Sequence, residues 1–252
     1  MLKIDLTGKT ALVTGATGQL GRTMVRTLAE AGADVAVHYR SNSDKAGELA
    51  AELEAEGRKH VAVQADITSK SDIHRMREKV TRALGPPGII VNNAVIQYGW
   101  KTVLEQDEAD YESQFRSCVM QNVLMAKAFV PAMIEAGWGR VIGVNTECTM
   151  QCWPGQSAYV SGKGGMDRLL RTLAGEIGRH NITVNEVAPG WTISEDNPGE
   201  GTPESYLNGV PLRRRGTDRE IANVVAFLAS DLASFITGAY IPVCGGNVMP
   251  AL

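Results

Sequence analysis

Short runs of apolar, often β-branched residues alternate along the chain with longer stretches whose apolar residues recur at helical spacing. Residues 11–15 predict a strand, residues 19–32 a helix that ends at a glycine, and residues 34–39 a second strand. The same pattern predicts strands at 60–66, 88–94, 140–146 and 182–190, and helices at 44–57, 71–85, 108–136 and from Ser157 onward. Buried strands separated by helices form parallel sheets with right-handed crossovers. We therefore expect an α/β fold: one doubly wound, mostly parallel seven-stranded sheet with helices on both faces.

One long stretch, residues 192–216, shows no periodic pattern and is rich in Gly, Pro and acidic residues. Loops of this length in compact domains usually serve as lids or binding loops. Since the sequence shows no linker, repeat or low-complexity tract, we interpret residues 1–252 as a single domain with a lid-like substrate loop at about 192–216. Disorder of that loop is the alternative.

A glycine-rich segment, TGATGQLG at 14–21, follows the first predicted strand and opens the first helix. Gly15, Gly18 and Gly21 allow a tight turn, close approach of the backbone to a diphosphate, and tight packing of helix on strand. The helix N-terminus adds free N–H groups and a partial positive charge. This strand-turn-helix context predicts a Rossmann-type, dinucleotide-binding domain rather than a simple turn.

The end of the second strand indicates which dinucleotide is bound. An NAD site usually offers Asp or Glu to the ribose 2′-hydroxyl at this point, but this chain has Tyr39 there, followed by Arg40 and Ser41. A guanidinium and a hydroxyl suit a 2′-phosphate, and Arg22 is a second candidate. We therefore predict that NADPH is preferred over NADH, with a solvated surface charge as the alternative interpretation of Arg40.

Tyr159 and Lys163 are four residues apart, which places them on the same face of the helix predicted from Ser157. A cation about 4 Å from a phenolate, at an effective dielectric constant near ~20, contributes roughly 4 kcal/mol and lowers the phenol pKa toward neutrality. Thr146 precedes this pair in the same segment. Taken alone, the spacing is more typical of a surface Lys beside a half-buried Tyr, so the rest of the chain decides between the two interpretations.

Composition and charge narrow the possible partners. The chain has 252 residues, 44% of them hydrophobic, a formal net charge of −3 and a pI of about 5.9. These values fit a globular domain with a large core and give no basic field that would gather nucleic acid or an anionic membrane. The sequence contains no run of apolar residues as long as a membrane span and no signal-peptide pattern at its start. We expect a cytoplasmic protein that binds neither nucleic acid nor membrane.

Four cysteines, Cys118, Cys148, Cys152 and Cys244, are too few for a disulfide framework in a chain of this length, and we expect free thiols. Cys148 and Cys152 are close in sequence, but no His lies near them. We therefore predict structural or pocket-lining thiols rather than a metal site.

Several motifs occur together and in order: TGATGQLG at 14–21, Asp66 at the end of a strand, NNA at 92–94, Tyr159 with Lys163, and Pro189 with Gly190. With these motifs the chain resembles the short, single-domain branch of the short-chain dehydrogenase/reductase family over nearly its whole length. Residues 220–246 are similar to the family's last helix and final strand. The resemblance implies hydride transfer between a nicotinamide and a small-molecule carbonyl or alcohol, and a homotetramer.

The resemblance also implies roles for individual residues. Tyr159 is the expected acid/base, Lys163 holds the nicotinamide ribose and lowers the pKa of Tyr159, and Thr146, where the family usually has Ser, binds the substrate oxygen. Glycines at 162, 164 and 165 suggest close packing of this helix against the cofactor or another helix. The expected cofactor-binding residues are Gly15, Thr17, Gly18, Gln19, Leu20, Gly21, Tyr39, Arg40, Ser41, Asp66, Ile67, Asn93, Ala94, Tyr159, Lys163, Pro189, Gly190 and Thr192. The expected substrate-binding residues are Gln97, Glu147, Trp153 and Trp191.

Besides Thr146, four positions depart from the family's pattern. Val95 replaces a glycine that lets the nicotinamide ribose approach, and Cys118 stands where a catalytic Asn of the proton relay is usual, with Asn122 one turn away. Gln19 replaces the middle glycine of the first motif, and Cys244 replaces a terminal Asp. Because of Val95 and Cys118, a nucleotide-binding protein with weak or lost catalysis is the alternative to an active NADP(H)-dependent oxidoreductase. A sugar-nucleotide epimerase or dehydratase is disfavoured, since the chain beyond Gly190 is too short for that branch's substrate domain.

Overall fold

The central element of the fold is a seven-stranded parallel sheet with strand order β3-β2-β1-β4-β5-β6-β9. The computed structural model describes residues 3–249. The strands are β1 (Thr10–Val13), β2 (Asp34–Tyr39), β3 (His60–Gln64), β4 (Ile89–Asn92), β5 (Gly139–Val144), β6 (Ile182–Pro189) and β9 (Tyr240–Val243). The strand order reverses between β1 and β4, which is the place where doubly wound sheets bind ligands. The predicted α/β fold class is confirmed.

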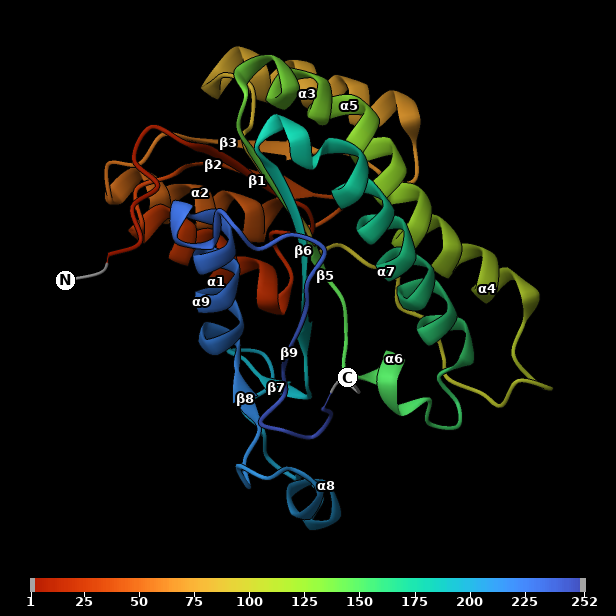
Figure 1. Ribbon diagram of the computed structural model, residues 1–252. Coiled ribbons are helices and arrows are strands. Elements are labelled where there is room, and N and C mark those ends of the chain that lie inside the picture. Colours follow the sequence, from red (N-terminus) through yellow and green to blue (C-terminus); the bar gives the residue numbers. More distant parts are fainter. Residues whose placement is uncertain (1–2, 250–252) are drawn as a thin grey trace.

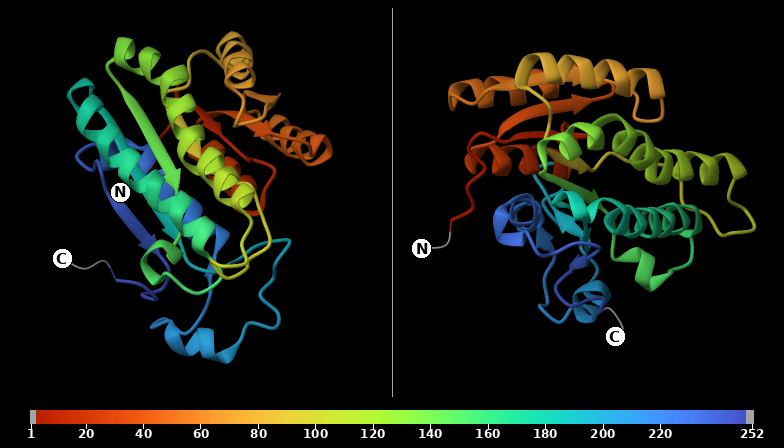
Figure 2. Two further views of the ribbon diagram at one scale, coloured as in Figure 1. Left: turned by 90° about the vertical axis from the view of Figure 1, so that its right-hand side faces the viewer. Right: turned by 45° about the horizontal axis from the view of Figure 1, so that its top comes forward.

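Helices cover both faces of the sheet (Figures 1 and 2). One face carries α1 (Gln19–Glu30), α2 (Ser43–Ala55) and α9 (Asp218–Ala229). The opposite face carries α3 (Lys70–Leu84), α5 (Gln121–Ala136) and α7 (Ser157–Ile177), while α4 (Glu108–Gln114) precedes α5. Short 3-10 turns follow α7 at Gly178–His180 and α9 at Asp231–Ala233.

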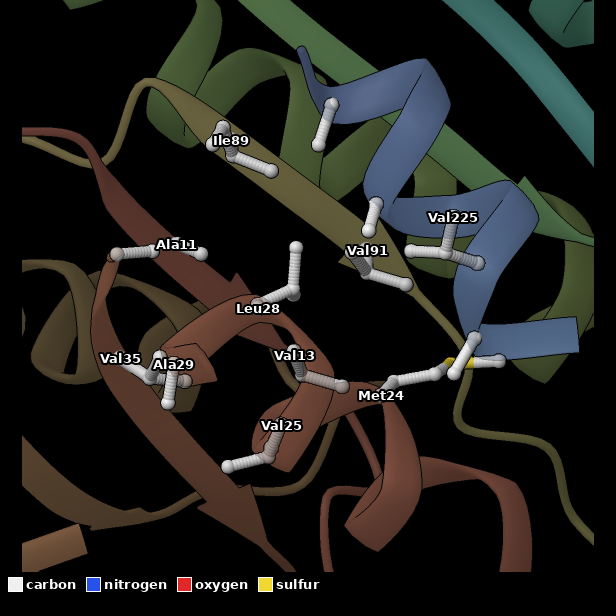
Figure 3. Packing of buried hydrophobic residues seen from close by; sticks show 14 of the residues in the cluster. Ala11, Val13, Met24, Val25, Leu28, Ala29, Val35, Ile89, Val91 and Val225 are labelled. Carbon is white, nitrogen blue, oxygen red and sulfur yellow. The ribbon is translucent and has the colours of Figure 1, made fainter. Parts of the chain in front are cut away.

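Alternation along the strands divides the interior into two apolar layers. In β1, Ala11 and Val13 belong to the cluster under α1 and α9, whereas Leu12 belongs to the cluster under α3, α5 and α7. Figure 3 shows Val25 and Leu28 of α1 packed beside the strand residues of the first cluster. Since burial of a Val or Leu side chain contributes roughly 1.5–3 kcal/mol, a one-residue slip of these strands would be strongly unfavourable.

The helical segment predicted at 108–136 is continuous but not uniform. A π-helical stretch, Phe115–Met120, separates α4 from α5. There the side-chain amides of Gln121 and Asn122 donate to the carbonyl oxygens of Ser117 and Cys118 at 2.8 and 2.6 Å. These side chains replace part of the regular backbone pairing, which a pattern of apolar residues cannot reveal.

This same segment, Glu108–Ala136, is long and apolar enough by composition to cross a membrane. Half of its most apolar window is buried inside the protein, where it packs on the sheet between α3 and α7. It is therefore the buried core helix of a doubly wound fold.

The stretch at 192–216 contains more regular structure than its sequence pattern suggests. It includes β7 (Thr192–Ile193) and α8 (Glu204–Gly209), and β7 pairs with β8 (Gly216–Thr217). Arg215 fastens the beginning of this segment, because its guanidinium donates to the carbonyl oxygens of Trp191 and Thr192. A further short helix, α6 (Cys148–Gln151), follows β5. Elements this short lack enough turns to show a period in sequence.

Candidate active site

The glycine-rich loop between β1 and α1 brings backbone close to the switch point of the sheet. Gly15 adopts a left-handed conformation with φ of 63°, and a Cβ atom there would lie 3.0 Å from the Cα atom of Ala94. A Cβ atom on Gly21 would overlap the carbonyl oxygen of Gly15. Gly18 is the N-cap of α1 and leaves its first N–H groups without a side-chain cap. This cradle of backbone at a helix N-terminus fits a nucleotide diphosphate.

Thr14 ties this loop to the segment that follows β4. Its hydroxyl oxygen accepts hydrogen bonds from the backbone N–H groups of Asn93 and Ala94 at 2.9 and 3.0 Å. In return, the side-chain amide of Asn93 donates to the carbonyl oxygens of Thr14 and Gly15. Two expected cofactor segments are thus held together, with Thr14 as a linking residue that the spacing of glycines did not single out.

At the end of β2, Arg40 and Ser41 are exposed directly before the N-terminus of α2, where Asn42 accepts from the N–H of Lys45. Arg40 forms no ion pair with any residue from 3 to 249. Arg22 differs: its buried guanidinium bonds Asp196 at 2.9 Å and the carbonyl oxygen of Thr17. Arg22 is therefore engaged by the 192–216 segment, whereas Arg40 is exposed. The assignment of either residue as a phosphate ligand stays a prediction.

Further expected cofactor residues lie near the ends of the strands. One carboxylate oxygen of Asp66 accepts from the N–H and the hydroxyl of Thr68, and Ile67 is buried. Gly190 follows β6, and a Cβ atom there would lie 3.0 Å from the Cβ atom of Cys244. The other expected cofactor residues lie in the loop between β1 and α1, in the first turn of α1, at the end of β2, at the end of β6 or at the start of β7: Thr17, Gln19, Leu20, Tyr39, Pro189 and Thr192.

The structure brings Thr146, Tyr159 and Lys163 together. Thr146 follows β5 and its hydroxyl accepts from the N–H of Cys148 at 3.2 Å. On α7, the ammonium nitrogen of Lys163 lies 5.9 Å from the ring centroid of Tyr159 and donates to the carbonyl oxygen of Val144 at 2.5 Å. The face shared by Tyr159 and Lys163 thus points at the residues that end β5.

Burial dominates the electrostatics of this group. It raises the pKa of Tyr159, and a side-chain hydrogen bond with Thr146 opposes the increase only in part. Burial also lowers the pKa of Lys163. Loss of solvent thus dominates the pKa of Tyr159 in this arrangement, and the lowering by Lys163 stays a prediction. The phenol is protonated at neutral pH, which is the form that can donate a proton.

Asn145 supports the site and was missed from the sequence. Its side-chain oxygen accepts from the N–H of Thr146, and its amide donates to the carbonyl oxygen of Lys163 at 3.2 Å and to the carboxylate of Glu186. Burial raises the pKa of Glu186 to about 8. Asn145 thereby fixes the segment with Thr146 against the helix with Lys163.

The glycines of α7 serve packing between helices. A Cβ atom on Gly162 would lie 3.0 Å from the carbonyl oxygen of Gln114, and one on Gly165 would lie 2.9 Å from a methyl group of Val119. Gly164 faces open space. The expectation of close packing is confirmed for Gly162 and Gly165, whose neighbours belong to α4 and the π-helical stretch.

Cys118 lies at the middle of the π-helical stretch and is buried in the apolar layer under α7, against which Val95 also packs. Its carbonyl oxygen accepts from the amide of Asn122, and the oxygen of that amide accepts from Asn92 at 2.6 Å. The two departures Val95 and Cys118 thus contribute to one apolar cluster, while Asn122 supplies an amide near the usual place.

The expected substrate residues fall into two groups. Gln97, Trp153 and Trp191 are exposed. Glu147 is buried, and its carboxylate accepts from the hydroxyl of Tyr206 at 3.4 Å and the amide of Asn247 at 3.0 Å. The carboxylate therefore joins α8 and the C-terminal segment, and its burial raises its pKa.

Aromatic rings line this end of the molecule. Trp100 stacks near Tyr159 with ring centroids 6.4 Å apart, and Trp191 meets Tyr206 edge to face at 5.1 Å. The hydroxyl oxygen of Tyr98 accepts a hydrogen bond from the backbone N–H of Tyr159 at 2.7 Å. Trp100 and Tyr98 thus both lie beside Tyr159.

All four cysteines are free thiols, as expected. Within residues 3–249 no group of three or more His, Cys, Asp or Glu side chains is arranged to hold a metal ion.

The sequence and the fold both match known proteins. A family profile described as Enoyl-(Acyl carrier protein) reductase matches residues 15–247. The 3-oxoacyl-(acyl-carrier-protein) reductase of Staphylococcus epidermidis is 35% identical over 96% of this chain and 99% of its own. A blue fluorescent protein from a metagenomic library, solved with NADPH, superimposes with a TM-score of 0.90 at 33% identity, over 97% of this chain and 100% of its own.

An NAD+-bound xylitol dehydrogenase superimposes with a TM-score of 0.88 at 28% identity, over 96% of this chain and 99% of its own. These matches extend over nearly the whole chain and include the glycine-rich loop and the Tyr159 segment described above. The chain therefore belongs to the short-chain dehydrogenase/reductase family of NAD(P)-dependent oxidoreductases that act on CH–OH and C=O groups.

Proposed function

We propose that the protein is an NADP(H)-dependent oxidoreductase that transfers hydride between the nicotinamide and a small carbonyl or alcohol substrate, with Tyr159 as the acid/base. The observation that supports this proposal most is the convergence of Thr146, Tyr159 and Lys163 beside the carboxyl ends of the sheet's central strands. A panel of aldehydes, ketones and polyols, with oxidation or reduction of the nucleotide followed by absorbance, tests it. Nucleotide binding without turnover of any substrate would favour the alternative of lost catalysis.

When bound, the nicotinamide supplies or accepts the hydride. The residues of the chain supply the proton and orient the substrate and the nucleotide. In reduction, the protonated phenol of Tyr159 donates to the carbonyl oxygen, and the hydroxyl of Thr146 donates a hydrogen bond to the same oxygen. Lys163 holds the nicotinamide ribose, and the burial of Tyr159 favours the protonated form of its phenol before the transfer.

We assign the diphosphate to the backbone cradle at Gly15, Gly18 and Gly21, and the 2′-phosphate to Arg40 with Ser41. Two features support this assignment: Arg40 is exposed beside the N-terminus of α2, and no carboxylate occupies position 39. A relative of similar fold was solved with NADPH, whereas the xylitol dehydrogenase was solved with NAD+. The choice between the two nucleotides therefore rests on the residues at the end of β2.

The wild-type protein is expected to bind NADPH at least about tenfold more tightly than NADH. Arg40→Ala should remove most of this preference, because the guanidinium offers the 2′-phosphate two hydrogen bonds and a charge. Tyr39→Asp should shift the preference toward NADH, since a carboxylate repels the 2′-phosphate and accepts from the 2′-hydroxyl. Direct titration of each protein with both nucleotides measures the ratio. Equal affinities of the wild-type protein for NADPH and NADH would contradict the assignment.

We further propose that the 192–216 segment acts as the substrate lid, that the protein is a cytoplasmic homotetramer, and that neither nucleic acid nor membrane is a partner. Support for the lid comes from α8, whose Tyr206 bonds Glu147 next to Thr146. The aromatic rings of Trp100, Trp153 and Trp191 suit a sugar-like or polyol ring at least as well as an acyl chain.

A further inference from the structure

His38 is a buried polar residue on β2 that the proposed chemistry leaves unused. Only 2% of it is exposed, and its imidazole bridges two parts of the chain. The N–H of Gly15 donates to Nδ1 at 2.9 Å, and Nε2 lies 3.0 Å from the carbonyl oxygen of Ala65. Since a carbonyl oxygen can only accept, Nε2 bears the hydrogen and Nδ1 is a bare acceptor.

The ring therefore has to be neutral and in one tautomer. Burial lowers the pKa of His38, and this effect outweighs the opposing effects of the hydrogen bond to Ala65 and of the charge of Asp66. A proton on Nδ1 would place two donors, the ring N–H and the N–H of Gly15, against each other. The buried environment thus preserves the acceptor that the loop uses.

His38 and Asn93 fix the first turn of the glycine-rich loop from two sides. The carbonyl oxygen of His38 accepts from the N–H of Ala16 at 2.8 Å, next to the bond from Gly15 to its ring. The amide of Asn93 donates to the carbonyl oxygen of Gly15 at 3.1 Å. Gly15 has the left-handed conformation that starts the turn, so both of its peptide groups are held.

We propose that His38 is a positioning residue for the nicotinamide nucleotide: its Nδ1 acceptor holds the Gly15 peptide so that the loop backbone is preorganised for the diphosphate. A loop held in its binding conformation loses less conformational freedom when the nucleotide binds, which increases affinity. The inference goes beyond the proposed function, because it assigns a role in nucleotide binding to a side chain that is buried behind the loop.

Two amide substitutions test the two hydrogen bonds of the His38 ring, to Gly15 and to Ala65, one at a time. In His38→Asn, the side-chain oxygen takes the place of Nδ1 and keeps an acceptor for Gly15. In His38→Gln, the side-chain nitrogen takes the place of Nε2 and keeps a donor for Ala65, while the acceptor for Gly15 is lost. The dissociation constants of NADPH and NADH are measured by direct titration, and the melting temperature of each nucleotide-free protein reports the fold.

His38→Asn is expected to bind the preferred nucleotide within about threefold of wild type, and His38→Gln at least about tenfold more weakly, because a buried backbone donor loses its partner. Equal affinities of the two variants at similar melting temperatures would show that His38 only packs. A wild-type protein that binds neither nucleotide would overturn both the role of His38 and the proposed function. Equal affinities of the two variants would overturn the role of His38 alone, so the two results are distinguishable.

A measurement on the unmodified protein keeps the inference testable if both variants fail to fold. Nitrogen chemical shifts of the histidine rings in labelled protein distinguish a bare Nδ1 from a protonated one. The inference requires a bare Nδ1 and a protonated Nε2 at His38, and slow hydrogen exchange of the Gly15 N–H. The opposite tautomer, or rapid exchange at Gly15, would overturn it.

Discussion

Tyr159→Phe is expected to lower turnover by at least about 10²-fold and by up to about 10⁴-fold, the range that a positioned general acid contributes. The substitution removes the proton that the substrate oxygen receives and leaves the ring, which stacks near Trp100. The phenol of Tyr159 is protonated at neutral pH and can donate this proton, whereas Phe has no hydroxyl to donate. Steady-state rates at saturating nucleotide and substrate measure the effect.

The control for this prediction is nucleotide affinity. Tyr159 lies on α7, whereas the diphosphate cradle lies between β1 and α1, so the dissociation constant of the nucleotide should change little in Tyr159→Phe. Turnover close to wild type in this variant would mean that another group, or water, supplies the proton. A parallel loss of nucleotide binding would instead point to a disturbed fold.

Thr146→Ala is expected to lower turnover by about 10²-fold or more, since the loss of one preorganised hydrogen-bond donor costs roughly 3 kcal/mol in the transition state. Thr146→Ser is the matched control, because it keeps the hydroxyl and removes only a methyl group. The backbone around Thr146 is held by Asn145 and Tyr240, so neither substitution should move the segment. Rates of both variants are compared at saturating substrate.

A different outcome would reassign the hydroxyl of Thr146. Its oxygen also accepts from the N–H of Cys148, a contact that starts α6. If Thr146→Ala turns over like wild type but melts at a lower temperature, the hydroxyl serves this local structure alone. The proposed chemistry would then depend on Tyr159 and Lys163.

The doubly wound sheet could be predicted because each strand and long helix shows its own pattern of apolar and polar residues. Runs such as 34–39 and 182–190 are apolar and β-branched, and each is bounded by glycines or polar residues. The helices of the two faces are long enough to show their period. By contrast, α6 and α8 have too few residues for a period, and the π-helical stretch depends on where Gln121 and Asn122 direct their amides.

The proposed catalytic group could be predicted from its motif, but its electrostatics could not. Spacing shows that Tyr159 and Lys163 share a helix face, yet only the packed structure shows how far burial raises the pKa of the phenol. Long-range partners are equally hidden from local patterns: Arg22 bonds Asp196, 174 residues further along the chain. His38 has no motif signal, because its role depends on strands that meet only in the folded sheet.

Transfer of deuterium from NADPH that carries deuterium at both positions of the reactive carbon C4 of the nicotinamide tests the central claim most directly. The label is followed by mass spectrometry in the product of whichever carbonyl substrate the wild-type protein reduces fastest. The account predicts one deuterium on the new carbinol carbon for the wild-type protein, and at least about 10²-fold less labelled product per unit time for Tyr159→Phe. Tight binding of NADPH without label transfer to any aldehyde or ketone, or undiminished transfer by Tyr159→Phe, would contradict it.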